Sequence, residues 1–282
     1  MPDSDKGRVQ SSKWADLGTR VASAIVLVGI VLGALWTGAL AWKLLVLAIV
    51  LIMLWELAPL CATGLDTPRR VLLAASPLFA IGLRMVLAVV QLPLSSMIVV
   101  LIPALFGLAI LPRGRLIWFG YVLMISLGAT VLVMLFSSLS AYAVIALVAL
   151  VAISDTLGYF AGRLIGGPKF WPRVSPKKTW SGTIAGWVGA ALFGAFVLAP
   201  YFAHHDVQET TPVLFAFLAV LIAFAGQMGD IAESAIKRRA GVKDASNLIP
   251  GHGGFLDRLD ALIAASAMLA LIAVIMNYMG LL

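Results

Sequence analysis

Residues 234–260 read SAIKRRAGVKDASNLIPGHGGFLDRLD and separate two long apolar runs near the C-terminus. Charge of both signs gathers in this stretch, together with one histidine. The residues concerned are Lys237, Arg238, Arg239, Lys243, Asp244, His252, Asp257, Arg258 and Asp260. Charged side chains are costly at the edge of a membrane, and those that occur there are commonly functional. The stretch therefore predicts a polar loop between two membrane-spanning helices, with a chemical role for its side chains.

The composition of the whole chain supports a membrane protein. Of its 282 residues, 62% are hydrophobic and 12% are charged, whereas a soluble domain carries about 25% charged residues. Apolar stretches of about 20 residues recur, and each can cross about 30 Å of hydrocarbon. The sequence thus predicts an all-α, polytopic integral membrane protein. The formal net charge of +7 does not indicate a nucleic-acid partner, because no face interleaves basic and aromatic residues.

The lengths of the apolar runs predict about nine transmembrane helices. Their expected spans are 20–37, 40–58, 71–91, 96–112, 116–136, 141–163, 182–202, 212–238 and 259–280. Residues 1–19 form a polar N-terminal segment, residues 20–140 hold about five helices, and residues 141–282 form a C-terminal catalytic region. Two loops of that region, 166–181 and 239–258, are rich in Gly, Pro and charge. Loops of this length in a helical bundle are commonly functional.

The distribution of basic residues predicts the orientation. With the N-terminus in the cytoplasm, all of the 20 Lys and Arg residues except Lys43 and Arg84 fall on the inner side of the membrane. The positive-inside rule describes this asymmetry. Both long loops then face the cytoplasm, so we expect a cytoplasmic active site in a bacterial inner or cell membrane.

A polar stripe develops along the predicted helix that ends in the charged stretch. Gln227, Asp230, Ser234 and Lys237 recur at i, i+3, i+7 and i+10, which puts them on one face, with Glu233 beside them. A stripe that faces solvent and pairs its carboxylates with Lys237 would explain the pattern without a site. The depth of Asp230 favours a bound cation, because an unpaired carboxylate is expensive there.

Asp257 and Asp260 begin the next predicted helix at i, i+3. The helix macrodipole stabilises acidic residues in this position, which is one explanation for them. The other explanation pairs Asp257 with Asp230 as oxygen ligands of Mg²⁺, which takes a few carboxylates together with water and phosphate oxygens.

Three glycines, Gly251, Gly253 and Gly254, precede that helix. Glycine permits close backbone approach, so successive amides here could hold a phosphate. A tight turn into the helix is the simpler explanation. His252 is accordingly either a donor to phosphate or a turn residue.

The order of these residues resembles the signature of the phosphatidate cytidylyltransferases, also called CDP-diglyceride synthases. The matching positions are Ser234, Ile236, Lys237, Arg238, Lys243, Asp244, His252, Gly253, Gly254, Asp257, Arg258 and Asp260. The segment Ser175-Pro176-Lys177-Lys178-Thr179-Trp180-Ser181-Gly182 is similar to that family's SPKKTxxG loop. Asp155 through Tyr159 to Gly162-Arg163 is similar to its D-x-x-x-Y-x-x-G-R element. The resemblance covers the C-terminal half of the chain.

The resemblance implies transfer of CMP from CTP to phosphatidic acid, giving CDP-diacylglycerol and pyrophosphate. It also implies Mg²⁺, a monovalent cation such as K⁺ at the metal centre, a membrane-lipid environment and a homodimer. The family's metal-binding acids map onto Asp230 and Asp257. Phosphatidate carries an ionised phosphate, so the main requirement is positive charge that brings two anions together in line.

We therefore predict that Lys237, Arg238, His252 and Arg258 act on the reacting phosphates. The residues predicted to bind substrate are Asp155, Tyr159, Ser175, Lys177, Lys178, Thr179, Ser234, Lys243, Asp244, Gly253, Gly254 and Asp260. A polytopic secondary transporter of an anionic substrate is the alternative, although the sequence shows no duplicated half. The sequence leaves the roles of Glu56 and Arg84 open.

Overall fold

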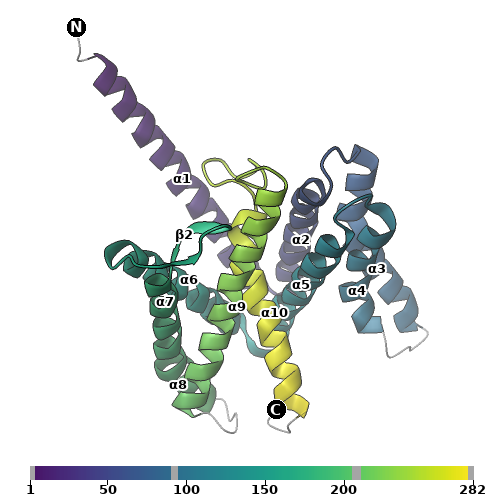
Figure 1. Cartoon of the computed structure of the whole chain (residues 1–282). Helices are drawn as coiled ribbons and strands as arrows, with labels where there is room; N and C mark the ends of the chain where they lie inside the picture. Colours follow the sequence, from purple (N-terminus) through teal and green to yellow (C-terminus); the bar gives the residue numbers. More distant parts are fainter. Residues whose placement is uncertain (1–3, 90–94, 205–210, 279–282) are drawn as a thin grey trace.

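The computed structural model describes residues 4–89, 95–204 and 211–278, and long helices dominate it (Figure 1). Its elements in chain order are α1 (Ser4–Thr37), α2 (Ala39–Cys61), α3 (Thr67–Val89), α4 (Ser95–Ile110), α5 (Arg115–Met134), the π-helical turn η1 (Leu135–Leu139), α6 (Ala141–Leu164), β1 (Lys169–Trp171), β2 (Ser175–Thr179), α7 (Trp180–Phe193), the π-helical turn η2 (Gly194–Leu198), α8 (Ala199–Ala203), α9 (Pro212–Arg239) and α10 (Leu256–Tyr278).

The predicted all-α, polytopic membrane fold is confirmed. Within the described residues, eight helical segments are long and apolar enough to cross a membrane. The α7–η2–α8 run counts as one of them, over Trp180–Ala203. The expected fourth span, which contains Pro103, is the shorter apolar helix α4. The cytoplasmic position of the N-terminus stays a prediction.

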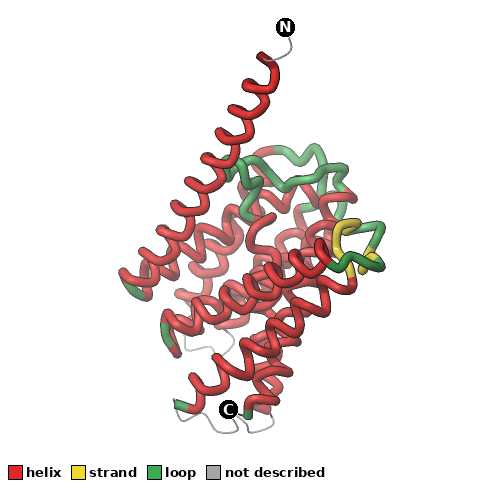
Figure 2. The backbone as a smooth tube through the Cα atoms, turned by 90° about the vertical axis from the view of Figure 1, so that its left-hand side faces the viewer, coloured by secondary structure: helices red, strands yellow, loops and turns green. Residues whose placement is uncertain are grey.

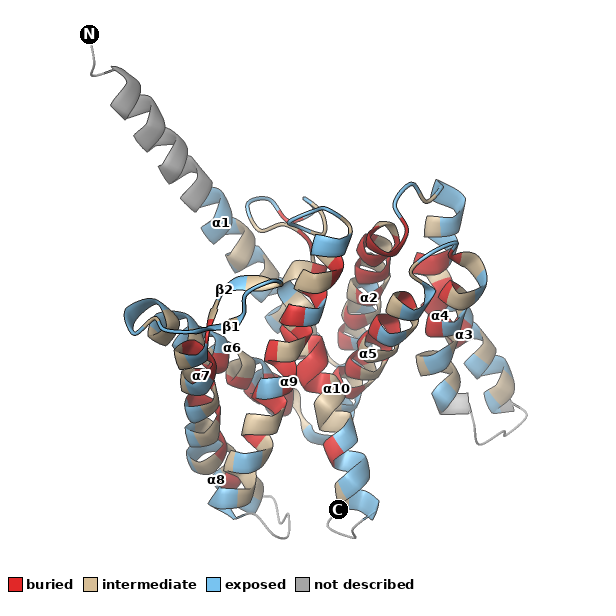
Figure 3. Cartoon of the chain, viewed as in Figure 1, coloured by how far each residue is buried: buried red, intermediate tan, exposed pale blue. Residues whose placement is uncertain are grey.

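The C-terminal half packs closely around α9 and α10. α9 packs on both α10 and α7, α6 packs on α7, and α10 also packs on α5. Gly182 of α7 lies so near the backbone of Gly158 in α6 that a side chain would collide with it, which is how small residues let membrane helices approach. Buried residues accordingly concentrate along α2, α5, α9 and α10, whereas α1 from Gly18 onward is largely exposed (Figure 3).

The two long loops lie at the same end of the bundle (Figure 2). The first is not a plain loop: β1 and β2 form an antiparallel hairpin, with Lys169 opposite Thr179 and Trp171 opposite Ser175. The second joins α9 to α10. The C-terminal end of α10 lies at the opposite end of the bundle (Figure 1), so both charged segments that the sequence singled out meet on one side.

Candidate functional site

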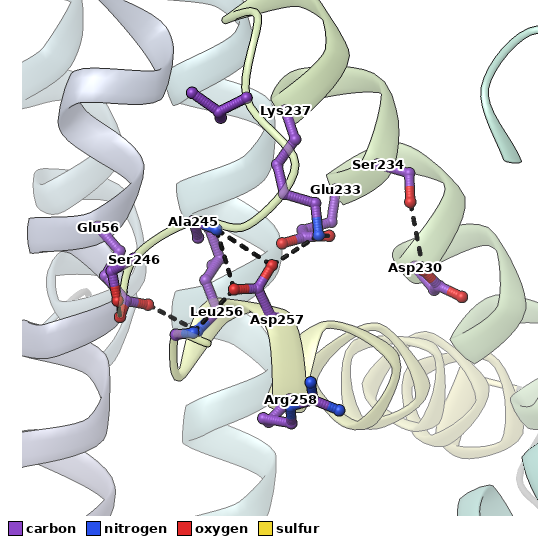
Figure 4. Close-up of polar contacts among 12 residues, drawn as sticks. Glu56, Asp230, Glu233, Ser234, Lys237, Ala245, Ser246, Leu256, Asp257 and Arg258 are labelled. Carbon is purple, nitrogen blue, oxygen red and sulfur yellow. Dashed lines mark hydrogen bonds and ion pairs between the residues drawn. The ribbon is translucent and has the colours of Figure 1, made fainter. Parts of the chain in front are cut away.

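Asp257 begins α10 and is tied to the loop before it. Its Oδ2 accepts hydrogen bonds from the amides of Gly254 at 2.8 Å and Ala245 at 2.9 Å. Its Oδ1 lies 2.6 Å from Lys237 Nζ of α9. The side chain is 5% exposed. Asp257 therefore satisfies two amides of the α9–α10 loop and also pairs with a cation across the helix interface (Figure 4).

Lys237 bridges two carboxylates. Besides Asp257, its Nζ lies 2.5 Å from Glu233 Oε2, one helical turn earlier in α9. The Lys237 side chain is 12% exposed, so this is a nearly buried ion cluster. Such a cluster is stable only when its charges are mutually compensated.

Asp230 connects α9 to the hairpin. Its Oδ2 lies 2.6 Å from Nζ of Lys178 in β2, and its Oδ1 accepts a hydrogen bond from Ser234 Oγ at 3.4 Å. Asp155 of α6 interacts electrostatically with both Lys178 and Asp230. The three segments that carried the family resemblance thus converge at Asp230.

Three carboxylates form a compact acidic group: Asp230 and Glu233 of α9, and Asp260 of α10. One oxygen of each lies within 4.8 Å of the others. Glu233 is 1% exposed, and its carboxylate forms an ion pair with Lys237, which Asp257 shares. One ammonium group thus serves two buried carboxylates, so a further cation would stabilise them.

The donor set fits a hard divalent cation. Carboxylate oxygens are the ligands that Mg²⁺ prefers, and the acidic group supplies three side chains. Together with Asp257, four carboxylates face the ammonium groups of Lys178 and Lys237. These carboxylates outnumber the two ammonium groups, so a divalent cation would reduce their mutual repulsion.

The two predicted Mg²⁺ ligands, Asp230 and Asp257, have different partners in the structure. Asp230 belongs to the acidic group, whereas Asp257 is engaged by Lys237 and by loop amides. Asp260, which the sequence assigned to substrate, lies in the acidic group and is 7% exposed. The ligand roles of Asp230 and Asp257 remain predictions.

A second cluster of predicted residues surrounds a pocket of about 610 Å³ on the α9–α10 loop. Lys243, Asp244, His252, Gly253 and Arg258 line it, together with Arg20 of α1. Two nitrogens of Arg258 donate to the carbonyl oxygen of His252, at 2.6 and 2.8 Å. The pocket is therefore predominantly basic, as an anionic ligand requires.

Besides Arg20, α1 contacts the wall of this pocket through Ser23. Ser23 Oγ lies 2.8 Å from His252 Nδ1 and 3.2 Å from the carbonyl oxygen of Pro250. The amides of Gly253 and Gly254 are donated within the protein, to Ile249 O and to Asp257. In this conformation neither amide is available to a phosphate, so the predicted contact of these glycines with substrate stays a prediction.

The other predicted residues are spread around these two clusters. Tyr159 is exposed, and its hydroxyl accepts a hydrogen bond from Arg163 at 2.9 Å. Thr179 is buried and caps α7, because its Oγ1 accepts from the amide of Gly182. Ser175 and Lys177 lie on β2, half-buried and exposed respectively. Arg238 donates to the carbonyl oxygen of Val242 at 3.2 Å.

Sequence reasoning left three residues without a role that the structure places in or beside these clusters. Glu233 joins the acidic group, and its i, i+3 spacing from Asp230 was the signal that could have found it. Arg20 lines the loop pocket. Glu56 of α2 accepts hydrogen bonds from the amides at the start of α10. No local sequence pattern predicts that contact.

Known proteins similar to this chain identify its family. The model of the "Cytidylyltransferase family" matches residues 18–276. A phosphatidate cytidylyltransferase of Brucella abortus (strain 2308) is 36% identical over 280 residues, which covers 93% of this chain and 94% of that protein. The enzyme of the same name from Haemophilus influenzae is 44% identical over 116 residues, which is 41% of this chain and 40% of that protein.

The family match spans all eight membrane-crossing segments and both clusters of predicted site residues. Similarity at this identity and coverage also includes the N-terminal helices, which the sequence motifs did not reach. The chain belongs to the cytidylyltransferase family, a family of nucleotidyl-transferring enzymes.

Proposed function

We propose that this protein transfers CMP from CTP to phosphatidic acid and releases pyrophosphate. The name that the Brucella and Haemophilus relatives carry supports the reaction. The observation that carries the proposal in the structure is the acidic group beside Lys178 and Lys237, in which the buried Glu233 shares the ammonium group of Lys237 with Asp257. A transporter of an anionic substrate would not need this group where the two charged loops meet.

The proposed reaction is a single in-line displacement. An oxygen of the phosphatidate phosphate attacks the α-phosphorus of CTP and forms a new P–O bond. The bond from that phosphorus to the bridging oxygen of the β-phosphate breaks, and pyrophosphate leaves with the electron pair. A covalent enzyme intermediate is not required, because the attacking phosphate is already ionised.

The residues of the chain would overcome the repulsion between two anions. Lys178 pairs with Asp230 and Lys237 pairs with Glu233 of the acidic group. Lys243, His252 and Arg258 present positive or hydrogen-bonding groups from the loop pocket. Mg²⁺ held by Asp230, Glu233 and Asp260, with Asp257 adjacent, would supply neutralisation of phosphate charge. Fixed cations of this kind act most strongly where water is excluded.

Three further features belong to the proposal. The reaction takes place on the cytoplasmic side, because the basic segments gather at the end of the bundle that holds both loops. The protein works as a homodimer, as the family resemblance implies. K⁺ occupies a second position at the metal centre.

The direct test uses purified protein in mixed micelles with phosphatidate, Mg²⁺ and CTP labelled at the α-phosphate. We expect label to enter the lipid fraction while an equal amount of pyrophosphate appears. Asp230→Asn should stop the transfer, whereas Asp66→Asn is the matched control, because Asp66 is an exposed acid that pairs only with Arg69 among the described residues. Label that stays in the aqueous phase with wild-type protein would refute the proposed reaction.

A further inference from the structure

Glu56 lies near the C-terminal end of an apolar helix and is completely buried. It belongs to α2, is 0% exposed, and comes from the half of the chain to which no motif pointed. Its Oε1 accepts hydrogen bonds from Ser246 Oγ at 2.5 Å and from the amide of Phe255 at 3.1 Å. Its Oε2 accepts from the amide of Leu256 at 2.7 Å. A buried carboxylate with three hydrogen-bond donors from one loop forms a specific contact with that loop.

The three donors come from two separate parts of the α9–α10 loop. Ser246 belongs to its first half, whereas Phe255 and Leu256 lead into α10. Asp257 closes the same two ends from the other side, through the amides of Ala245 and Gly254. Figure 4 shows Glu56 and Asp257 on opposite sides of this junction. The two carboxylates thus hold residues 245–246 and residues 254–256 together at the base of the loop.

Residues 247–253, between these two restrained segments, form a protruding lobe. This lobe supplies most of the pocket wall, including His252 and Gly253. Ser246 extends the restraint into the lobe, because its Oγ also accepts a hydrogen bond from the amide of Leu248 at 3.2 Å. The position of the lobe therefore depends on a side chain of α2.

Gly254 provides an independent indication that the carboxylate must sit at this point. A Cβ atom at this position would lie 2.7 Å from Glu56 Oε1 and 2.9 Å from Oε2. Glycine thus leaves room for Glu56 to reach the amides of the next two residues, Phe255 and Leu256, without displacing its carboxylate. This close approach explains Gly254 without any contact to substrate.

The charge of Glu56 is compensated where it sits. The free amides at the start of α10 form the positive end of the helix dipole. Arg70 of α3 interacts electrostatically with Glu56 and donates from its Nε to the carbonyl oxygen of Trp55 at 2.9 Å. Glu56 needs no metal or substrate as a partner, so its contacts can persist throughout a reaction cycle.

We infer that Glu56 is a positioning residue for the proposed reaction: it fixes the α9–α10 loop and the start of α10 against α2, and so aims Asp257 and the lobe at CTP. This inference rests on the proposed function for its kinetic readout, but its structural readout does not depend on activity. Glutamine in place of Glu56 keeps the size but has one acceptor oxygen, so at least one of the three donors loses its partner.

The test compares Glu56→Gln with wild-type protein in detergent, by hydrogen–deuterium exchange and by steady-state kinetics. We expect faster exchange in peptides from residues 241–257 and unchanged exchange in α9. For CTP, kcat/KM should fall by roughly 10- to 100-fold, the usual effect of removing a group that orients a site. The loss should arise from a higher KM for CTP, with KM for phosphatidate unchanged. A merely destabilised protein would instead lose active molecules, which lowers kcat and leaves KM for CTP as it was.

Ser246→Ala is the milder variant and decides the question if Glu56→Gln does not fold. It removes one of the three donors, so the same peptides should exchange faster to a smaller extent. Ser266→Ala is its matched control, because Ser266 is a buried serine of α10 whose hydroxyl donates to the helix carbonyl of Leu262. Local exchange and KM for CTP equal to those of Ser266→Ala would overturn the inference. Inactive wild-type protein would refute the proposed function instead, while the exchange measurement would still decide the role of Glu56.

Discussion

Replacing Lys237 with Met should destabilise the protein strongly in the absence of divalent cations. The ammonium group lies 2.5 Å from Glu233 and 2.6 Å from Asp257, and the side chains of the three residues are 12%, 1% and 5% exposed. Removing one partner of a buried ion pair costs about 3–5 kcal/mol. At about 2–4 °C per kcal/mol, the expected fall in Tm is about 6–20 °C.

Mg²⁺ should restore part of this loss. Without Lys237 the acidic group carries one more uncompensated negative charge, so it has more to gain from a divalent cation. A ligand that binds only the folded state at 100 times its Kd adds about 2.7 kcal/mol to stability. We therefore expect Mg²⁺ to raise the Tm of Lys237→Met by more than it raises the wild-type Tm.

The chain carries its own reporter for this measurement. Cys61 is the single cysteine and is buried, so a thiol-reactive fluorogenic dye will report unfolding as Cys61 becomes accessible. Lys43→Met is the matched control, since Lys43 is an exposed lysine of α2. An unchanged Tm in Lys237→Met, or an equal response of both proteins to Mg²⁺, would refute the electrostatic reasoning.

Two further predictions concern the site and the hairpin. Asp230→Asn and Asp257→Asn should each lower kcat in the micelle assay by about 100-fold or more, the scale of losing one electrostatic group at a reacting centre, while both proteins still elute as folded membrane species. Near wild-type turnover in either variant would contradict its predicted ligand role. Thr179→Ala should lower Tm by about 2–4 °C, because loss of a helix cap costs about 1 kcal/mol, whereas Thr179→Ser should retain the wild-type Tm. Equal melting of the two variants would show that the cap of α7 contributes nothing.

Much of the fold could be predicted because the length and hydropathy of a segment suffice to predict a membrane-spanning helix. α9 and α10 begin and end within a few residues of the expected spans. The hairpin was not foreseen: Ser175–Thr179 contains proline and two lysines, and its pairing with Lys169–Trp171 has no strong propensity behind it.

Contacts of the candidate site could be predicted where two side chains share one face of a helix. They could not be predicted where a side chain binds backbone amides that are distant in the sequence. The sequence pairs Asp257 with Asp230 and assigns Asp260 to substrate, whereas in the structure it is Asp260 that joins Asp230 in the acidic group. That choice depends on the amides of Ala245 and Gly254, which occupy Asp257. Glu56 was unassignable for the same reason, since two of its three partners are amides about 200 positions away.

The contact of Ser23 with His252 has a consequence for how the lipid environment acts on this protein. Ser23 lies in the apolar part of α1, over Gly18–Thr37, which packs on α2 and is otherwise largely exposed. A helix held so lightly adjusts its tilt when bilayer thickness changes, and Ser23 would carry that tilt to the imidazole of His252. Hydrophobic mismatch would thereby alter the geometry of the loop pocket. Transfer rates in vesicles of short-chain and long-chain lipids should accordingly diverge more for wild-type protein than for Ser23→Ala.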